Sequence, residues 1–463
     1  MTGAHAKTAP TEITPQMARR AALGSFVGAV VEWYDFLIYT VVAALVFNKQ
    51  FFPELNPTLG QIAAFATFAV GFIFRPLGGA FFGHFGDKLG PKKVLVWTIV
   101  VMGTATVLIG CIPSYHTIGI AAPILLVGMR CVQGFAVGGE WGGAALMAVS
   151  QAPKGRKAFY SSGVQMGYGI GLILANGLFL LVLTLLGNDA MIEWGWRIPF
   201  IFAGLLVAVG LWVRVGVADI HHADVAPAAL QEDDQPTPGK RAKAPLLEAI
   251  TKDPIAFFQI VGIRAVEMFT MFIVTTFGLA YSRNTLNWDA SEFLRIAIVI
   301  GAISLVTIPT FAHLSDRFGR KPVYLTGAVI GGLGAFPFFN SLVAGNLLLT
   351  WVFALILVNL AHDLAVSVQQ PLITELFGAK HQYSGAGFGY QVAAVLVGGF
   401  TPSIATWIQG PQAEGGLGLG APGVAWYVVL GAVVSFLTVF FMKPRLPEDL
   451  GTANVSADKI QAE

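Results

Sequence analysis

A short charged stretch decides the fold: Gly83-His84-Phe85-Gly86-Asp87-Lys88-Leu89-Gly90-Pro91-Lys92-Lys93. A related stretch follows 229 residues later, Ala312-His313-Leu314-Ser315-Asp316-Arg317-Phe318-Gly319-Arg320-Lys321. Both read His-x-x-Asp-(Lys or Arg)-x-Gly-x-Lys, and each lies between two apolar stretches of helical length. A basic turn repeated at half the chain length predicts two similar halves in tandem, an arrangement common among membrane transporters.

The composition is that of a membrane protein. Of 463 residues, 55% are hydrophobic and 12% are charged, and the mean hydropathy is +0.69. Soluble domains carry about twice this charged fraction. The net charge of +2 implies no nucleic-acid partner. The two cysteines fall in apolar spans and form neither a metal-binding spacing nor a disulfide framework, so we expect no metal and no cofactor.

The hydrophobic pattern predicts an all-α protein with twelve transmembrane helices. Their expected limits are 21–47, 58–85, 92–112, 119–150, 158–187, 195–217, 254–281, 291–315, 322–343, 347–376, 384–409 and 422–443. The expected organisation is an N-terminal tail (1–17), a six-helix half (18–217), a polar linker (218–252), a second six-helix half (253–443) and a C-terminal tail (444–463).

The basic residues predict the orientation in the membrane. With both termini in the cytoplasm, most Lys and Arg residues outside the helices lie on the cytoplasmic side, in agreement with the positive-inside rule. The opposite side then keeps only Lys49, Arg197, Arg283 and Arg295. Both copies of the repeated loop are therefore expected in the cytoplasm.

Several ionisable residues occur near the middle of predicted helices, where a charge costs at least ~2.5–3.5 kcal/mol. The first helix carries Glu32 and Asp35 on one face, and the fourth carries Arg130 and Gln133. Such residues need a partner, a cavity or a function. We expect Arg130 to bind the carboxylate of an anionic substrate, since its forked guanidinium suits that group. The alternative is that Arg130 only neutralises Glu32 or Asp35.

The second half carries its own polar positions. The tenth helix has a polar stripe of Asn359, His362, Asp363 and Gln370. The seventh helix has Arg264 and Glu267, three residues apart, which a local ion pair would explain as well as a functional role. Glycines spaced by four, such as Gly134 and Gly138, predict close helix packing rather than binding.

Three segments resemble the metabolite:proton symporter family of the major facilitator superfamily: Glu32-Trp33-Tyr34-Asp35-Phe36, Arg75-Pro76-Leu77-Gly78-Gly79 and Arg130-x-x-Gln133-Gly134-x-x-x-Gly138-Gly139-Glu140-Trp141. Within that family the chain is most similar to bacterial shikimate permeases, through Ala361-His362-Asp363 and Tyr383-Ser384-Gly385 among others. The resemblance covers nearly all of 21–443.

The resemblance implies a proton-coupled symporter in the bacterial cytoplasmic (inner) membrane, acting as a monomer on a small organic anion, with shikimate as the first expectation. Another metabolite of the family, such as 2-oxoglutarate, citrate, proline or betaine, is an open alternative, and so is an uncoupled uniporter or exchanger. An ATP-driven pump and an intramembrane enzyme are disfavoured, because the chain lacks G-x-x-x-x-G-K-(S/T), H-E-x-x-H and G-x-S-x-G.

The candidate site residues fall into three groups. The substrate-binding group is Arg130, Gln133, Gln165, Tyr168, Asn359, His362, Gln370 and Gln391. The proton-coupling group is Glu32 and Asp35, with Asp363 next in order, because a membrane carboxylate can be charged or neutral near physiological pH. The gating group, whose loops the resemblance implies to latch the cytoplasmic side, is Asp87, Lys88, Glu140, Asp316, Arg317 and Arg320.

Overall fold

The computed structural model describes residues 15–89, 91–138, 156–218, 254–374, 376 and 382–442. Every regular element in these ranges is helical. The first set of helices, called here the N-terminal set, is α1 (Pro15–Val42), η1 (Ala43–Phe47), α2 (Asn48–Phe51), α3 (Pro57–Leu89), α4 (Pro91–Cys111), α5 (Tyr115–Ile118), α6 (Ala121–Gly138), α8 (Lys157–Ala190), η2 (Met191–Gly195) and α9 (Arg197–Ala218).

The second set, called here the C-terminal set, follows after the undescribed residues 219–253. Its elements are α11 (Pro254–Phe272), η4 (Ile273–Phe277), α12 (Gly278–Asn284), α13 (Ala290–Phe318), α14 (Arg320–Val343), α15 (Leu347–Leu355), η5 (Ile356–His362), α16 (Asp363–Thr374), α17 (Gln382–Ala393), η6 (Ala394–Gly399), α18 (Thr401–Gln409), η7 (Gln412–Glu414) and α19 (Gly420–Phe441).

The predicted membrane helices are confirmed. Ten described helical stretches are long and apolar enough to cross a membrane, and two shorter apolar helices, Val96–Cys111 and Arg197–Trp212, coincide with the predicted third and sixth spans. Helices are the expected form because each backbone polar group in a bilayer needs an internal partner. Several spans begin at proline, as α3 does at Pro57, where the missing N–H costs no helical hydrogen bond.

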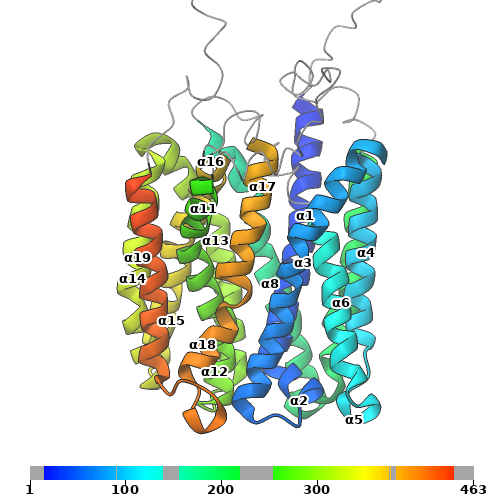
Figure 1. The fold of residues 1–463 in the computed structure, drawn as a ribbon, viewed down its shortest axis with the longest axis vertical. Coiled ribbons are helices and arrows are strands. Elements are labelled where there is room, and N and C mark those ends of the chain that lie inside the picture. The colour runs from blue at the N-terminus through cyan, green and yellow to red at the C-terminus, as the bar shows by residue number, and fades with distance from the viewer. Residues whose placement is uncertain are drawn as a thin grey trace, which may run out of the picture.

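The helices run side by side as one bundle (Figure 1). The N-terminal set includes α1, α3, α4 and α6 on one side, and the C-terminal set includes α14, α15 and α19 on the other. We name the two ends of the bundle from this view. The tail end contains the start of α1 and the end of α19, and the loop end contains α2, α5, α12 and η7.

Glycines bring helices into backbone contact, as the four-residue spacing predicts. A Cβ added at Gly134 on α6 would lie 2.0 Å from the carbonyl oxygen of Gly71 on α3. Between the two sets, a Cβ at Gly169 on α8 would lie 2.7 Å from the carbonyl oxygen of Gly301 on α13. Real Cβ atoms do not approach so closely, so these contacts require glycine and fix α3 against α6 and α8 against α13.

The repeated loop has a structural reason for its glycine. Gly319 joins α13 to α14 with φ 94° and ψ 150°, a backbone conformation that residues with a Cβ rarely adopt. Because of this turn, Gly319 is the single residue between the end of α13 and the start of α14. The equivalent glycine of the first copy, Gly90, lies outside the described residues.

Wide helical turns of the π type interrupt four of the long spans. Two of them, η1 and η4, occupy matching places in the first and seventh spans, 230 residues apart. The offset agrees with that of the repeated loop and supports the tandem plan. The other two, η5 and η6, interrupt the tenth and eleventh spans. Such turns are frequent at functional sites.

Candidate functional site

One buried cavity lies between the two sets of helices. Its lining residues come from both sets: Trp33, Gln165, Tyr168, Glu267, Met268, Met271, Ile308, His362, Val366 and Tyr390. The free volume is about 10 Å³, close to what a single water molecule needs. A ligand with a six-membered ring therefore requires these side chains or their helices to move apart.

Two predicted substrate-binding residues on α8 line this cavity. Gln165 and Tyr168 are one helical turn apart and are 5% and 2% exposed. Gln165 Nε2 and the Tyr168 hydroxyl make no hydrogen bond within the described residues. The ring of Tyr168 lies 5.0 Å from the imidazole of His362 and 5.1 Å from the indole of Trp33, centroid to centroid. Buried polar groups without partners cost free energy, so these two atoms distinguish this wall of the cavity from ordinary packing.

Asp35 is part of a hydrogen-bonded network inside the N-terminal set. Gln133 Nε2 on α6 donates to Asp35 Oδ2 at 2.5 Å, and the Thr106 hydroxyl on α4 donates to Asp35 Oδ1. Gln133 Nε2 also lies 2.8 Å from Thr106 Oγ1. Gln133 can only donate to Asp35, whereas the Thr106 hydroxyl, which also lies 2.9 Å from the carbonyl oxygen of Met102, can donate or accept.

Arg130 lies on the far side of the same network. One terminal nitrogen donates to Gln133 Oε1, and the other lies 3.3 Å from the carbonyl oxygen of Phe68. The guanidinium sits 3.9 Å from the centroid of the Tyr39 ring. Arg130 is buried and does not line the cavity described above. Its contact with Asp35 through Gln133 agrees with the alternative that Arg130 neutralises a carboxylate.

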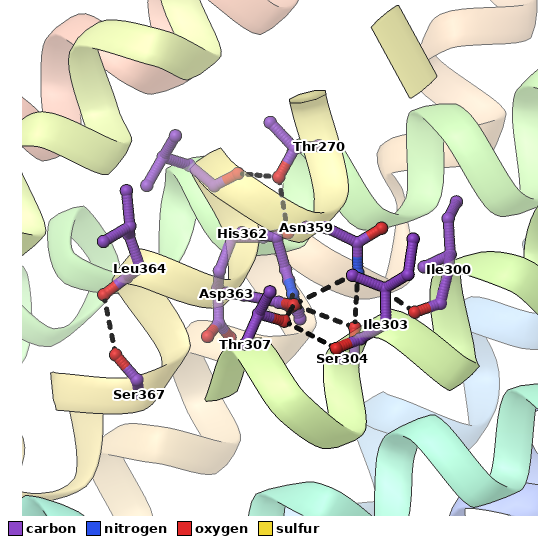
Figure 2. Close-up of polar contacts among 12 residues, drawn as sticks. Thr270, Ile300, Ile303, Ser304, Thr307, Asn359, His362, Asp363, Leu364 and Ser367 are labelled. Carbon is purple, nitrogen blue, oxygen red and sulfur yellow. Dashed lines mark hydrogen bonds and ion pairs between the residues drawn. The ribbon is translucent and has the colours of Figure 1, made fainter. Parts of the chain in front are cut away.

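A second network surrounds Asp363 in the C-terminal set (Figure 2). Asp363 Oδ2 accepts hydrogen bonds from Ser304 at 2.9 Å, from Asn359 Nδ2 at 3.2 Å and from Thr307. Asp363 Oδ1 lies 2.8 Å from His362 Nδ1. The carboxylate is completely buried and does not line the cavity itself. His362 connects Asp363 to the cavity, because its ring contacts one and lines the other.

The third polar group is the pair for which the sequence left the role open. Arg264 on α11 pairs with Glu267 at 2.9 Å, and its guanidinium lies 3.4 Å from the centroid of the Tyr390 ring. Glu267 and Tyr390 both line the cavity. The i, i+3 spacing was visible, but it suggested a local pair as readily as a functional one. Tyr390, which shows that the pair faces the cavity, is 126 residues away from Arg264 along the chain.

The remaining candidates of the central site are placed as follows. Glu32 interacts electrostatically with Arg75 on α3 and with Tyr390. Gln370 and Gln391 are buried, each with one amide atom that has no partner within the described residues, yet neither lines the cavity. Asn359 supports Asp363 rather than facing the cavity.

At the tail end, Asp316 of the second loop copy caps a helix of the other set. Asp316 Oδ1 accepts from the backbone N–H of Ala158 at 3.1 Å, and Oδ2 accepts from that of Phe159 at 2.9 Å. These are free N–H groups of the first turn of α8, where the helix dipole favours a negative charge. Arg317 lies over the ring of Phe318 at 5.5 Å. Arg320 begins α14 and has an interaction partner of its own.

The other gating candidates belong to the first loop copy. The side chains of Asp87 and Lys88 lie outside the described part of the structure, and so does the whole of Glu140.

The loop end is closed by contacts between the sets. The Glu414 carboxylate on η7 accepts from the Thr58 hydroxyl at 2.6 Å and from its backbone N–H at 3.2 Å, which caps the start of α3. Asn284, at the end of α12, donates to Gln61 Oε1 at 3.2 Å and to the carbonyl oxygen of Ala44 at 3.3 Å. Neither contact was predicted, because each pairs residues more than 200 positions apart.

Within the described residues, two sets of membrane helices enclose a central cavity and make contacts at both ends of the bundle, an arrangement typical of multi-pass membrane transporters. The chain belongs to the Major Facilitator Superfamily, whose family model matches residues 22–402 and 266–459.

Individual relatives agree with this assignment. The chain is 50% identical to the shikimate transporter of Escherichia coli over 94% of this chain and 97% of that one. It is 35% identical to the proline/betaine transporter of Escherichia coli over 96% of this chain and 87% of the other. Its fold matches the proton:xylose symporter XylE with a TM-score of 0.70 at 16% identity, covering 94% of this chain and 98% of that chain.

Proposed function

We propose that this protein is a proton-coupled symporter that imports shikimate, a small organic anion, across the bacterial inner membrane by alternating access. The observation that carries the proposal is the buried polar cavity between the two sets, in a chain 50% identical to a shikimate transporter. The unit proposed to transport is the monomer, because the two sets of helices that line the cavity belong to a single sequence.

The chemistry of the cavity supports a polyhydroxylated ring acid as substrate. Shikimate has a six-membered ring, three hydroxyl groups and one carboxylate. Gln165 and Tyr168 offer polar atoms without partners to hydroxyl groups, and Trp33 offers an aromatic surface to the ring. Binding sites of this kind combine apolar walls with a few placed polar groups.

Asp35 is our choice for the proton-coupling carboxylate, with Glu32 as its neighbour one turn away on α1. With Asp35 ionised, Gln133 and Thr106 can both donate to the carboxylate. A proton on Oδ1 makes the Thr106 hydroxyl an acceptor, so that it donates to the carbonyl oxygen of Met102 instead, and the network rearranges. A carboxylate whose protonation changes the packing between α1, α4 and α6 can link a proton to a conformational change. Arg130 acts in this proposal through Gln133, as the fixed positive charge beside Asp35.

The two ends of the bundle supply the gates. We assign the tail end to the cytoplasm, where the basic loops fit the positive-inside rule. Asp316 then latches the cytoplasmic side by capping α8, and the contacts of Glu414 and Asn284 latch the outer side. Alternating access requires these sets of contacts to break in turn. Asp87, Lys88, Glu140, Arg317 and Arg320 are proposed to serve the cytoplasmic latch.

The test is uptake of radiolabelled shikimate into proteoliposomes that contain the purified protein, with the outside more acidic than the inside. Unlabelled shikimate, 2-oxoglutarate, citrate, proline and betaine are added as competitors. We expect uptake above the level of protein-free liposomes, abolished by a protonophore and inhibited by shikimate most strongly. Uptake that the protonophore does not reduce would instead indicate a uniporter. Stronger inhibition by another compound than by shikimate would indicate a different substrate.

A further inference from the structure

The ion pair of Arg264 and Glu267 stands at the wall of the central cavity. Arg264 is 1% exposed and Glu267 is 2% exposed. One guanidinium nitrogen of Arg264 donates to Glu267 Oε1 at 2.9 Å, and another lies 3.5 Å from the carbonyl oxygen of Tyr390. The guanidinium plane is supported by the Tyr390 ring at 3.4 Å. Arg264 is thus held in place by a ring and a carboxylate that both line the cavity.

The pair is not fully satisfied. Arg264 Nε makes no hydrogen bond within the described residues, and near Glu267 Oε2 the side-chain amide of Gln369 is close enough to act on the carboxylate without forming a hydrogen bond of good geometry. An arginine that paired only to hold α11 together would gain most from a two-pronged bond to its carboxylate. Here a single bond joins the two groups, which leaves donors on Arg264 for a second carboxylate.

An anionic substrate needs a positive group in this cavity. Arg130 does not line it, and His362 already faces Asp363 at 2.8 Å. Arg264 does not line the cavity either, but it is hydrogen-bonded to Glu267, which does.

We infer that Arg264 binds the carboxylate of the substrate, and that Glu267 is an internal substitute that holds Arg264 until the substrate takes its place. The inference rests on the proposed function and names the residue that recognises the anion. The Tyr390 ring holds the Arg264 guanidinium in a fixed plane, in which it can exchange the Glu267 carboxylate for that of the substrate.

Protonation of Glu267 favours the exchange, because a neutral carboxyl releases Arg264 and removes the negative charge that repels the substrate. The charged and titratable groups that face Glu267 are Arg264 on its own helix, His362 at the junction of η5 and α16, Tyr390 on α17, Tyr168 on α8 and Tyr324 on α14. Glu267 thereby makes substrate binding depend on pH, separately from the coupling carboxylate Asp35.

The alternative is a purely structural pair. In that case, neutralising Glu267 leaves a buried arginine without a counter-ion and weakens both the fold and substrate binding. In our inference, the same change frees Arg264 for the substrate and strengthens binding. The two accounts therefore predict opposite signs for one variant.

The experiment measures equilibrium binding of radiolabelled shikimate to the purified protein at pH 8 and at pH 5.5. The variants are Glu267→Gln, Arg264→Lys and the double variant Arg264→Gln with Glu267→Gln, which removes both charges together and so leaves no buried charge unpaired. Glu292→Gln is the matched control, since Glu292 pairs with Arg295 at the same i, i+3 spacing and 2.7 Å on the exposed surface of α13. Thermal unfolding of each variant shows that it is folded.

We expect Glu267→Gln to bind at least as tightly as the parent at pH 8 and to lose the tightening that the parent shows at pH 5.5. The double variant should lose binding by tenfold or more, Arg264→Lys should lie between, and the control should match the parent. If a folded double variant binds like the parent, or if Glu267→Gln binds as poorly as the double variant, the inference is wrong. A parent that binds no shikimate refutes the proposed substrate and the inference together, whereas binding by the parent with unchanged variants refutes the inference alone.

Discussion

Replacing Asp35 with asparagine tests the proton-coupling network. Gln133 Oε1 accepts from Arg130, so its Nε2 must face Asp35, at 2.5 Å. An asparagine can offer its Oδ1 to Gln133 and its amide N–H to the Thr106 oxygen, whose hydroxyl then donates to the carbonyl oxygen of Met102. The loss is the difference between a charged and a neutral hydrogen bond, about 1 kcal/mol of stability. The variant therefore folds with a lower midpoint of thermal unfolding.

The effect on transport is larger. Symport of one proton with one monovalent anion is electroneutral and gains ~1.4 kcal/mol per pH unit, a tenfold accumulation. With an inside-alkaline gradient of two units, the parent should accumulate shikimate ~100-fold in proteoliposomes. Asp35→Asn cannot release the proton and should only equalise the concentrations, while exchange of labelled for unlabelled shikimate continues.

The control is Asp189→Asn, which removes an exposed carboxylate at the end of α8 and should behave like the parent. Accumulation by Asp35→Asn equal to that of the parent would refute the reasoning and place the coupling proton elsewhere, with Glu32 or Asp363 as the next positions to test.

Three further predictions concern packing, gating and pH. Gly134→Ala should destabilise the fold by more than 1 kcal/mol in thermal unfolding, because the new Cβ would lie 2.0 Å from a carbonyl oxygen of α3, whereas Gly128→Ala, with nothing within 4 Å, should not. Asp316→Asn should slow exchange across the membrane while shikimate binding is kept, since it weakens the cap on α8; a loss of binding at unchanged exchange would contradict this. Asp289 caps α13, and the hydrogen bond from the backbone N–H of Ser291 lowers the pKa of its carboxyl group. Asp289→Ala should therefore cost ~1 kcal/mol of stability at neutral pH. The difference from the parent should disappear below that lowered pKa, because acid then protonates the parent carboxylate.

The fold could be read from the sequence because two independent patterns agreed. Apolar runs of membrane length fixed the spans, and the loop around Asp87 recurring around Asp316 indicated two related sets of six. The structure explains why the loop pattern is informative. In the second copy, Gly319 provides the sharp turn and Asp316 caps a helix of the opposite set, so both residues have a structural role there.

The site could be read only in part. Three of the polar residues singled out in apolar helices, Gln165, Tyr168 and His362, line the cavity, and their roles stay predictions. The orientation of each side chain depends on neighbouring helices, which the sequence does not order in space. Arg130 shares a helix face with Gln133, but Tyr39 and Asp35 hold that face inside the N-terminal set.

The same limit applies to pairs made between distant segments. The sequence did not indicate that Thr106 contacts Asp35. A threonine hydroxyl in an apolar helix commonly donates to a backbone carbonyl of the preceding turn, and Thr106 also makes this contact, with Met102. The link between Glu414 and Thr58 joins two loops of ordinary composition. Only the packed bundle brings these groups together.

The central claim is that the proton and the organic anion cross the membrane together, and the most direct test is to follow both at once. Shikimate is added to weakly buffered proteoliposomes that hold the purified protein, and the external pH is recorded while labelled shikimate enters. The account predicts that the external medium becomes alkaline in step with uptake, and that Asp35→Asn abolishes the alkalinisation. Shikimate entry with no change in external pH would contradict it.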